Sequence, residues 1–195
     1  MDSVNDYEAV FCAAADEHLG VIEALKGEAG VVAAMAAAMA DCLRSGNKVC
    51  FMGNGGSAAD SQHLAAELVG RFQMERKGLP SIAFTVDTSI LTAVGNDYGY
   101  DDVYRRQAEA LVVKGDLVVG ISTSGNSENV LRGLAEARER GAVTAALTGG
   151  DGGRMKAEGL ADHVLVVPGK GSARIQEGHI LVGHVLCDLA ERAVS

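Results

Sequence analysis

Proline is scarce in this sequence: its 195 residues contain only two prolines, against 25 glycines. Because proline interrupts helices and strands while glycine permits tight turns, this balance favours regular elements joined by many short glycine loops. No apolar run reaches the ~18 residues of a membrane span, so we expect no membrane partner. The first eight residues, MDSVNDYE, are acidic and lack the basic start of a signal peptide, so we expect a cytoplasmic protein.

Basic residues are also fewer than acidic ones, and the formal net charge is -9. This excess of acidic residues argues against general binding to nucleic acid or to an anionic membrane. One basic patch, around Arg71, Arg76 and Lys77, could still meet a phosphate. The four cysteines lack the paired spacing of a zinc site, which favours buried thiols of a cytosolic protein.

Apolar residues make up 48% of the chain and charged residues 22%, which is typical of a globular fold. At this length we expect one domain over residues 1–195, with an N-terminal helical segment (1–45) and an α/β core (46–195). Apolar strand-like runs alternate with helical segments, which predicts a parallel sheet covered by helices on both faces. The expected strands are 49–52, 81–87, 117–122, 143–147 and 163–167, and the expected later helices are 89–94, 103–112, 128–140 and 175–194, with a loop over 95–100.

Alanine and methionine occupy nearly every side of the predicted helix 31–43. A helix that is apolar all round must be buried. In a domain this small, a terminal helix is most easily buried against another subunit, which favours an oligomer. The alternative is a helix that packs only on its own sheet.

The segment from Lys48 to Arg71 joins a short apolar strand, a glycine-rich loop (Gly53 to Ser57) and an alanine-rich helix. Three glycines in four positions let the backbone turn tightly and approach a ligand. Ser57 with Asp60 resembles a capping pair at the start of the helix. Free N–H groups and the helix dipole at such a start both favour an anion.

A second loop of similar build runs from Ser122 to Ser127, and four of its six residues carry hydroxyl groups. Amides and hydroxyls at a helix start suit a phosphate monoester, and in an open parallel sheet ligands bind beyond the carboxyl ends of the strands. Neither loop has the lysine of a nucleotide P-loop, so triphosphate cleavage is not expected. One such loop alone would be explained by turn chemistry, but two on one sheet favour phosphate binding.

A dinucleotide site is the competing interpretation of the first loop, because Gly53, Gly55 and Ala58 fit G-x-G-x-x-A. The acidic residue expected ~20 positions later is Glu75, but it lies in the polar stretch MERKG and not at a strand end. We therefore favour the phosphate monoester.

His63 and Glu67 are four residues apart and share one face of the helix that follows the first loop. On the last helix Gln176 and His184 are polar among apolar neighbours, but on one straight helix they are ~12 Å apart along the axis. To meet at one metal ion, either Gln176 precedes the helix proper or the two residues act from different chains.

Five stretches together resemble the SIS (sugar isomerase) domain family, and within it the phosphoheptose isomerases. They span Val49 to Asp188 and read GNGGSAADSQHLAAELVGRF, DTSILTAVGNDYGYDDVYRRQ, GISTSGNSENVL, ALTGGDGG and ARIQEGHILVGHVLCD. The resemblance implies a five-stranded parallel sheet between helices in a three-layer sandwich, assembled as a homotetramer with sites at the subunit interfaces. The apolar helix 31–43 agrees with that assembly.

The resemblance also implies a role for each matching residue. Glu67 and His184 would be the catalytic base and acid. Zinc would be the cofactor, bound through His63, Glu67, Gln176 and His184. The residues that would bind the sugar phosphate are Asn54, Gly55, Gly56 and Ser57 in the first loop, Ser122, Thr123, Ser124 and Ser127 around the phosphate, Asn96 and Asp97 at its hydroxyls, and Glu67 and Gln176.

The expected activity is the conversion of sedoheptulose 7-phosphate to an aldoheptose 7-phosphate, with D-glycero-D-manno-heptose 7-phosphate the expected product. Such an aldose–ketose isomerase moves a proton between C1 and C2 through an enediol and needs a base and an acid. The alternative is a non-catalytic SIS-domain protein that binds sugar phosphates or serves as a replication-initiator adaptor. Such adaptors tend to lack the acid–base pair, so Glu67 and His184 favour the enzyme.

Overall fold

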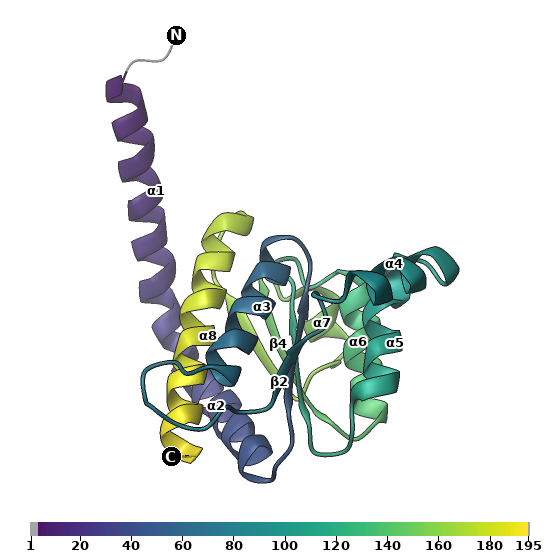
Figure 1. The fold of residues 1–195 in the computed structure, drawn as a ribbon. Coiled ribbons are helices and arrows are strands. Elements are labelled where there is room, and N and C mark those ends of the chain that lie inside the picture. The colour runs from purple at the N-terminus through teal and green to yellow at the C-terminus, as the bar shows by residue number, and fades with distance from the viewer. Residues whose placement is uncertain (1–3, 195) are drawn as a thin grey trace.

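The computed structural model describes residues 4–194, apart from the Asn5 side chain, so the first three residues of the acidic N-terminus lie outside the described part. Five parallel strands form one sheet in the order β2-β1-β3-β4-β5 (Figure 1). The strands are β1 (Val49–Gly53), β2 (Ser81–Ala83), β3 (Leu117–Ile121), β4 (Val143–Gly149) and β5 (His163–Val167). The prediction of a five-stranded parallel sheet is confirmed.

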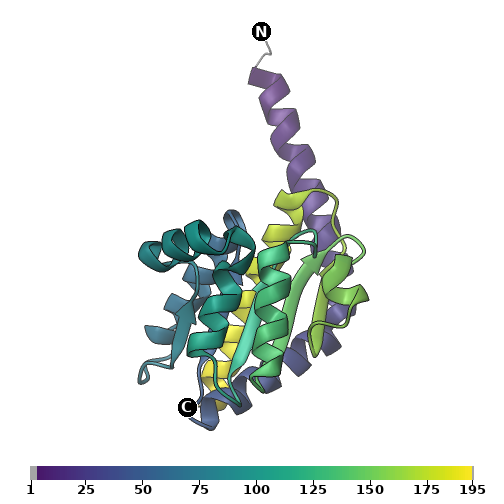
Figure 2. The ribbon, with the colours of Figure 1, turned by 90° about the vertical axis from the view of Figure 1, so that its right-hand side faces the viewer.

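Helices cover both faces of the sheet in three layers, as Figures 1 and 2 show. Two separate apolar cores result, because a strand buried on both faces sends alternate side chains to opposite sides. On one face lie α1 (Val4–Leu25), α2 (Ala29–Arg44), α3 (Gly56–Val69) and α8 (Ser172–Val194). On the other lie α4 (Thr88–Asp97), α5 (Val103–Leu111), α6 (Glu128–Glu139) and the short α7 (Gly153–Ala157). Short 3-10 turns, Lys26–Glu28 and Tyr100–Asp102, precede α2 and α5.

The direction of the strand order reverses between β1 and β3, which lie side by side with Gly53 opposite Ile121. In open parallel sheets, such a switch point leaves a crevice beyond the carboxyl ends of the two strands. The two loops singled out in the sequence follow β1 and β3, so both begin at this crevice.

Helix α1 stands away from the body of the molecule over its first half (Figures 1 and 2). Its large apolar side chains are exposed there, with Val4 at 70% and Phe11 at 73%, whereas Val21 near its other end is buried. Helix α2 is two-sided: Met35 and Met39 are each 1% exposed within their own protomer, while Ala33 lies at the surface. The prediction that α2 is buried is therefore right for one face, and that face packs on its own sheet and on α8.

Some element boundaries differ from the expected ones. The predicted strand 81–87 keeps only three residues, because its one neighbour, β1, pairs with it only up to Ala83. The predicted loop 95–100 is wrong in its first part, since α4 continues through Asp97. Helix α8 begins at Ser172, earlier than predicted. Within residues 4–194, no helix is both long enough and apolar enough to cross a membrane.

Candidate active site

The first loop turns sharply from β1 into α3 through Gly55, whose φ of 55° lies in the left-handed region. A Cβ on Gly53 would lie 2.8 Å from Ser57 Cβ and 2.9 Å from the Ile121 carbonyl oxygen, so only glycine fits there. The predicted capping pair is wrong: the N-cap is Gly55, and no side chain caps the helix. Ser57 is instead buried on the first turn, where its carbonyl oxygen accepts a 2.8 Å hydrogen bond from Ser61. The backbone amides at this helix start carry no side-chain cap.

The second loop gathers its hydroxyl groups at the end of β3. The Ser122 and Ser127 hydroxyls lie 2.9 Å apart, and Ser124 Oγ accepts a 3.2 Å hydrogen bond from the Asn126 amide. Thr123 Oγ1 lies 3.5 Å from the hydroxyl of Ser172, the first residue of α8. Ser124 is exposed while Ser122 is buried, so the hydroxyl groups of this loop lie at different depths from the surface.

Asn129, which sequence reasoning did not single out, joins the two loops. It is buried on the first turn of α6 and exchanges two hydrogen bonds of 2.9 Å with Asn54 of the first loop. The hydroxyl of Tyr104, on α5, donates to the Gly53 carbonyl oxygen at the end of β1. Burial raises the pKa of Tyr104, which keeps its hydroxyl protonated as a donor. Both anchors fix the position at which β1 ends.

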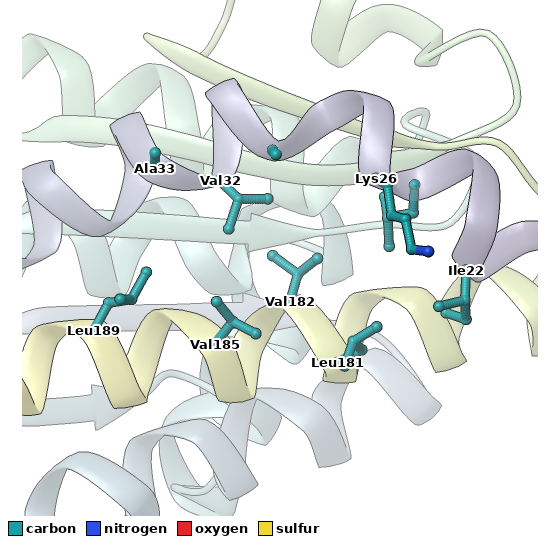
Figure 3. Close-up of a pocket in the computed structure, with 10 residues that line it drawn as sticks. Ile22, Lys26, Val32, Ala33, Leu181, Val182, Val185 and Leu189 are labelled. Carbon is teal, nitrogen blue, oxygen red and sulfur yellow. The ribbon is translucent and has the colours of Figure 1, made fainter.

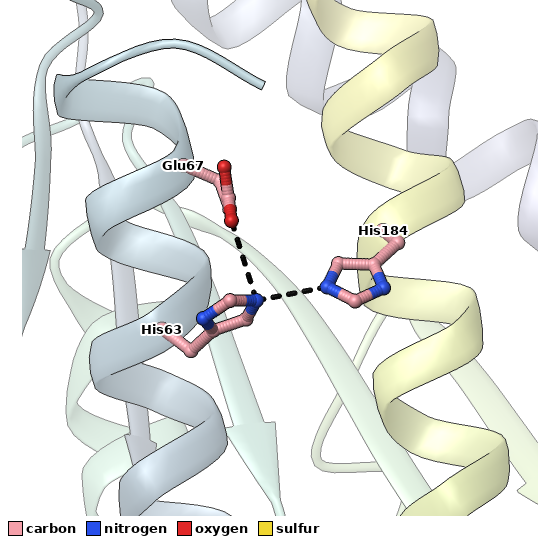
Figure 4. Close-up of side chains that lie close together, drawn as sticks. All are labelled: His63, Glu67 and His184. Carbon is pink, nitrogen blue, oxygen red and sulfur yellow. Dashed lines mark hydrogen bonds and ion pairs between the residues drawn. The ribbon is translucent and has the colours of Figure 1, made fainter. Parts of the chain in front are cut away.

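Three side chains from two helices meet between α3 and α8 (Figure 4). His63 and Glu67 project from α3, and His184 projects from α8. His63 Nε2 lies 2.8 Å from His184 Nε2 and 3.3 Å from Glu67 Oε1. One ligand atom of each residue lies within 4.8 Å of the others, so this cluster could hold a metal ion or work as an acid–base group.

Two further residues, Phe72 and Asp60, lie against this cluster, and neither was predicted there from the sequence. The ring of Phe72 stacks on His184 with 5.5 Å between the centroids. Asp60, one turn before His63, has a buried Oδ2 without a hydrogen-bond partner. Burial raises the pKa of Asp60, while the charges of His63 and His184 act in the opposite direction. The only sequence signal for the place of Asp60 was its i, i+3 spacing from His63, and Phe72 had none.

Gln176 lies away from the cluster in the protomer. It is the fifth residue of α8, and its side chain fills the space at Gly56, where a Cβ would lie 2.6 Å from Gln176 Nε2. Gln176 therefore borders the first loop, inside the helix and just past its first turn. One protomer brings together His63, Glu67 and His184 but not the fourth predicted metal ligand.

Asn96 and Asp97 lie at the exposed end of α4, in the opposite helix layer. Asn96 Nδ2 donates a 2.8 Å hydrogen bond to Asp97 Oδ1. Of the described contacts, none joins these two side chains to either loop.

The expected basic patch is wrong for Arg76. Its side chain is 6% exposed, and its guanidinium pairs with Glu191 at 2.9 Å, so it does not face solvent. Arg71 is exposed, with a loose 3.6 Å pair to Glu75, and Lys77 is also exposed. Only these two can meet an anion from solution.

A 2-1-3-4-5 sheet with a glycine-rich and a hydroxyl-rich loop at its switch point, and an imidazole–carboxylate cluster between two of its helices, is typical of α/β proteins that bind phosphorylated ligands. The SIS domain family profile matches residues 11–149. A phosphoheptose isomerase of Geobacter sulfurreducens is 58% identical over 173 residues, which cover 88% of this chain and 90% of that one.

Solved structures agree with this match. The phosphoheptose isomerase of Neisseria gonorrhoeae has a TM-score of 0.88 and 42% identity, covering 97% of this chain and all of that one. That of Francisella tularensis has the same TM-score at 37% identity and covers 98% and 100%. The chain belongs to the phosphoheptose isomerases of the SIS-domain family.

Proposed function

We propose that this chain converts sedoheptulose 7-phosphate to an aldoheptose 7-phosphate through an enediol, with D-glycero-D-manno-heptose 7-phosphate as the product. The observation that carries the proposal is the meeting of Glu67 and His184, from α3 and α8, in a protomer that carries a glycine-rich and a hydroxyl-rich loop at the switch point of its sheet. Membership of the phosphoheptose isomerases supports the same activity. A cytoplasmic location is part of the proposal.

The two loops bind the two ends of the substrate. The phosphate is held by the second loop, through Ser122, Thr123, Ser124 and Ser127. The sugar lies along the first loop, at Asn54, Gly55, Gly56 and Ser57. Gln176 borders that loop and contacts the sugar, and Asn96 and Asp97 reach its hydroxyl groups when α4 of this or another subunit lies over the site. Binding the phosphate remote from C1 and C2 holds the reacting carbons at the cluster.

Glu67 is the base that takes a proton from C1 of the ketose and returns it to C2. His184 is the acid that donates a proton to the C2 carbonyl oxygen, and its neutral imidazole then takes the proton of the O1 hydroxyl as the aldehyde forms, which restores the acid. The 2.8 Å contact between His63 and His184 and the stacked ring of Phe72 orient the His184 imidazole. One proton leaves C1 and one reaches C2, so the reaction is balanced without an oxidant.

The same cluster fits zinc. Two imidazoles and one carboxylate, with ligand atoms within 4.8 Å of one another, match the donor set of catalytic zinc sites, and an amide is a weak fourth ligand that substrate can displace. When bound, the ion supplies Lewis-acid polarisation of the carbonyl oxygen. His63, Glu67 and His184 of one protomer would hold it, and Gln176 would join from a neighbouring subunit. A ligand carboxylate is a weaker base, so the metal and the simple acid–base pair are competing roles for Glu67.

We also propose a homotetramer in which the single domain, residues 1–195, assembles through its N-terminal helices. An open apolar groove of about 440 Å³ lies between α1, α2 and α8 (Figure 3). Leu181, Val185 and Leu189, at steps of four along α8, line it and are 37–41% exposed. Such a stripe on a protein with no membrane-spanning helix in its described part suits another copy of the chain.

Turnover of sedoheptulose 7-phosphate, with the product identified by NMR, tests the proposed function. We expect an aldoheptose 7-phosphate and deuterium incorporation at C2 in D₂O. Tight binding of the sugar phosphate without turnover or exchange would favour the non-catalytic alternative, a SIS-domain sensor or a replication-initiator adaptor.

A further inference from the structure

The loop between α3 and β2, residues 70–80, contains no helix or strand, yet it is fixed at its centre by one buried ion pair. Arg76 Nε lies 2.9 Å from Glu191 Oε1, and the two side chains are 6% and 0% exposed. Glu191 belongs to α8, seven residues and about two turns beyond His184, so it lies on nearly the same face of that helix.

Arg76 uses its Nη1 and Nη2 donors on the end of α3 and the loop that follows it. Its Nη2 donates to the carbonyl oxygen of Glu67 at 2.9 Å, and its Nη1 donates to that of Leu68 at 2.9 Å. Two longer bonds reach the carbonyl oxygens of Gly70 and Lys77, at 3.3 and 3.0 Å. The last carbonyls of a helix have no partner within it, so Arg76 caps α3 at the residue that carries the catalytic carboxylate.

Glu191 holds the other side of the same loop. Its carboxylate accepts three backbone N–H bonds, from Phe72 at 3.0 Å and from Gln73 and Met74 at 2.8 Å each. Burial acts to raise the pKa of Glu191, but these donors and Arg76 outweigh it and leave the pKa below its ordinary value. Phe72, fixed by the first bond, is the residue whose ring stacks on His184.

The pair therefore touches both halves of the acid–base cluster through the main chain. One partner holds the backbone of Glu67, and the other holds Phe72 against His184. A buried ion pair is a poor source of net stability, since taking two charges out of water offsets their attraction. The hydrogen bonds that Arg76 and Glu191 make to the backbone are nevertheless directional. They can therefore fix one geometry of a loop that has no helix or strand of its own.

We propose that Arg76 and Glu191 are positioning residues that set the approach of Glu67 to His184. This rests on the proposed function, in which those two residues carry the proton transfers. Neither Arg76 nor Glu191 touches substrate in this proposal. Their removal lowers the chemical rate and leaves binding of the phosphate, made by the distant loops, nearly unchanged.

Two variants test the proposal. Glu191→Gln keeps the shape but removes the charge, and Arg76→Lys keeps the charge but cannot serve the four carbonyl groups. The matched control is Lys48→Gln, which breaks another ion pair, Lys48 with Asp116 at 2.5 Å, at the starts of β1 and β3. All proteins are assayed well below their melting temperatures, with kcat and KM measured separately.

We expect kcat to fall on the order of 10-fold or more in both variants, with KM within about threefold of wild type, because small misplacements of reacting groups are costly. Lys48→Gln should keep kcat within about twofold at a similar loss of melting temperature. Unchanged kcat in either folded variant would overturn the proposal, and Arg76→Lys carries the test if Glu191→Gln does not fold.

The ring signals of His184 in NMR spectra separate this proposal from the proposed function. They should move in Glu191→Gln and Arg76→Lys but not in Lys48→Gln. If wild type does not turn over the sugar phosphate, the proposed function fails, and the His184 signals alone decide the positioning role. Ring signals that stay in place in both variants would overturn it.

Discussion

Asn54 and Asn129 exchange two hydrogen bonds of 2.9 Å across the switch point of the sheet. Asn129 Oδ1 also accepts the amide of Val130 at 2.9 Å, so the pair is tied to the start of α6. The first loop and the second loop thus keep a fixed separation. In the proposed complex their donors need not reorganise when the ligand binds, which reduces the entropic cost of binding.

Loss of a phosphate donor should weaken binding more than catalysis. In Ser124→Ala we expect KM for the sugar phosphate to rise by about 5- to 160-fold with a small change in kcat, since one hydrogen bond to a charged group contributes ~1–3 kcal/mol. Ser57→Ala should act in the same direction. Ser45→Ala, at the end of α2, is the control for kinetics. Equal binding of the heptulose with and without its phosphate would contradict the assignment of the phosphate to the second loop.

Loss of the base should affect the chemical step. Glu67→Gln keeps the size and hydrogen bonding of the side chain but removes the proton acceptor, so we expect kcat to fall on the order of 10²-fold or more with an intact fold. Glu139→Gln, on the surface of α6, is the matched control. Steady-state assays with circular dichroism check this, and near-normal turnover by Glu67→Gln would remove Glu67 from the mechanism.

Removal of metal should distinguish the two roles of the cluster. If zinc is bound, chelation lowers activity, added zinc restores it, and His63→Ala lowers metal content in elemental analysis. His163→Ala, on β5, should leave metal content unchanged. Full activity in metal-free protein that gains nothing from added zinc would leave Glu67 and His184 as a plain acid–base pair.

Assembly should depend on the groove between α1, α2 and α8. Val185→Glu places a charge on the apolar stripe and should convert the tetramer to smaller species, because an unpaired charge is costly to bury. Val113→Glu, exposed on the other side of the sheet, is the control. Light scattering that finds a monomeric, active wild type would contradict the tetramer. Met35→Glu is unsuitable for this test, since Met35 is buried within its own protomer and its loss would unfold the chain.

Stability should depend on pH through His179, which is fully buried on α8 and donates a 3.0 Å hydrogen bond to the Thr148 carbonyl oxygen. Burial lowers its pKa from 6.5 to about 4, against the opposing effect of that hydrogen bond. The unfolded chain therefore binds a proton more readily than the folded one. The contribution of neutral His179 to the free energy of unfolding is fully present above pH 6.5. It is lost as the pH falls toward about 4, by about 3 kcal/mol in all.

In His179→Gln the free energy of unfolding should depend less on pH over that range. His163→Gln is the control, and urea titrations at several pH values measure both. An unchanged pH dependence in His179→Gln would show that His179 does not carry the effect.

Local patterns in the sequence predicted the parallel sheet and both loops. His63 and Glu67 were predictable as a pair because four residues on one helix fix their relative placement. His184 joins them through the packing of α8 on α3, which the resemblance implied but periodicity does not encode. A Cβ on Gly183 would lie 2.6 Å from Leu64, so the close approach of the two helices depends on that glycine.

Other parts of the site depend on contacts between distant residues and gave no local signal. Arg76 lies in a polar stretch that looks exposed, and its partner Glu191 is far along the chain. The same holds for Phe72 on His184 and for Asn129 on Asn54. The Ser57–Asp60 capping pattern failed because Gly55, with its positive φ, is the N-cap, two positions before Ser57.

The exposed first half of α1 carries a cysteine, Cys12, whose reactivity can report on assembly. Cys12 is exposed on that helix, while the other three cysteines are buried, and burial raises their pKa to about 11 or 12. A thiol reagent should therefore label native protein first at Cys12. If α1 is covered by a neighbouring copy, labelling should slow as protein concentration rises, so the reaction rate would measure the dissociation constant of the assembly without any engineered label.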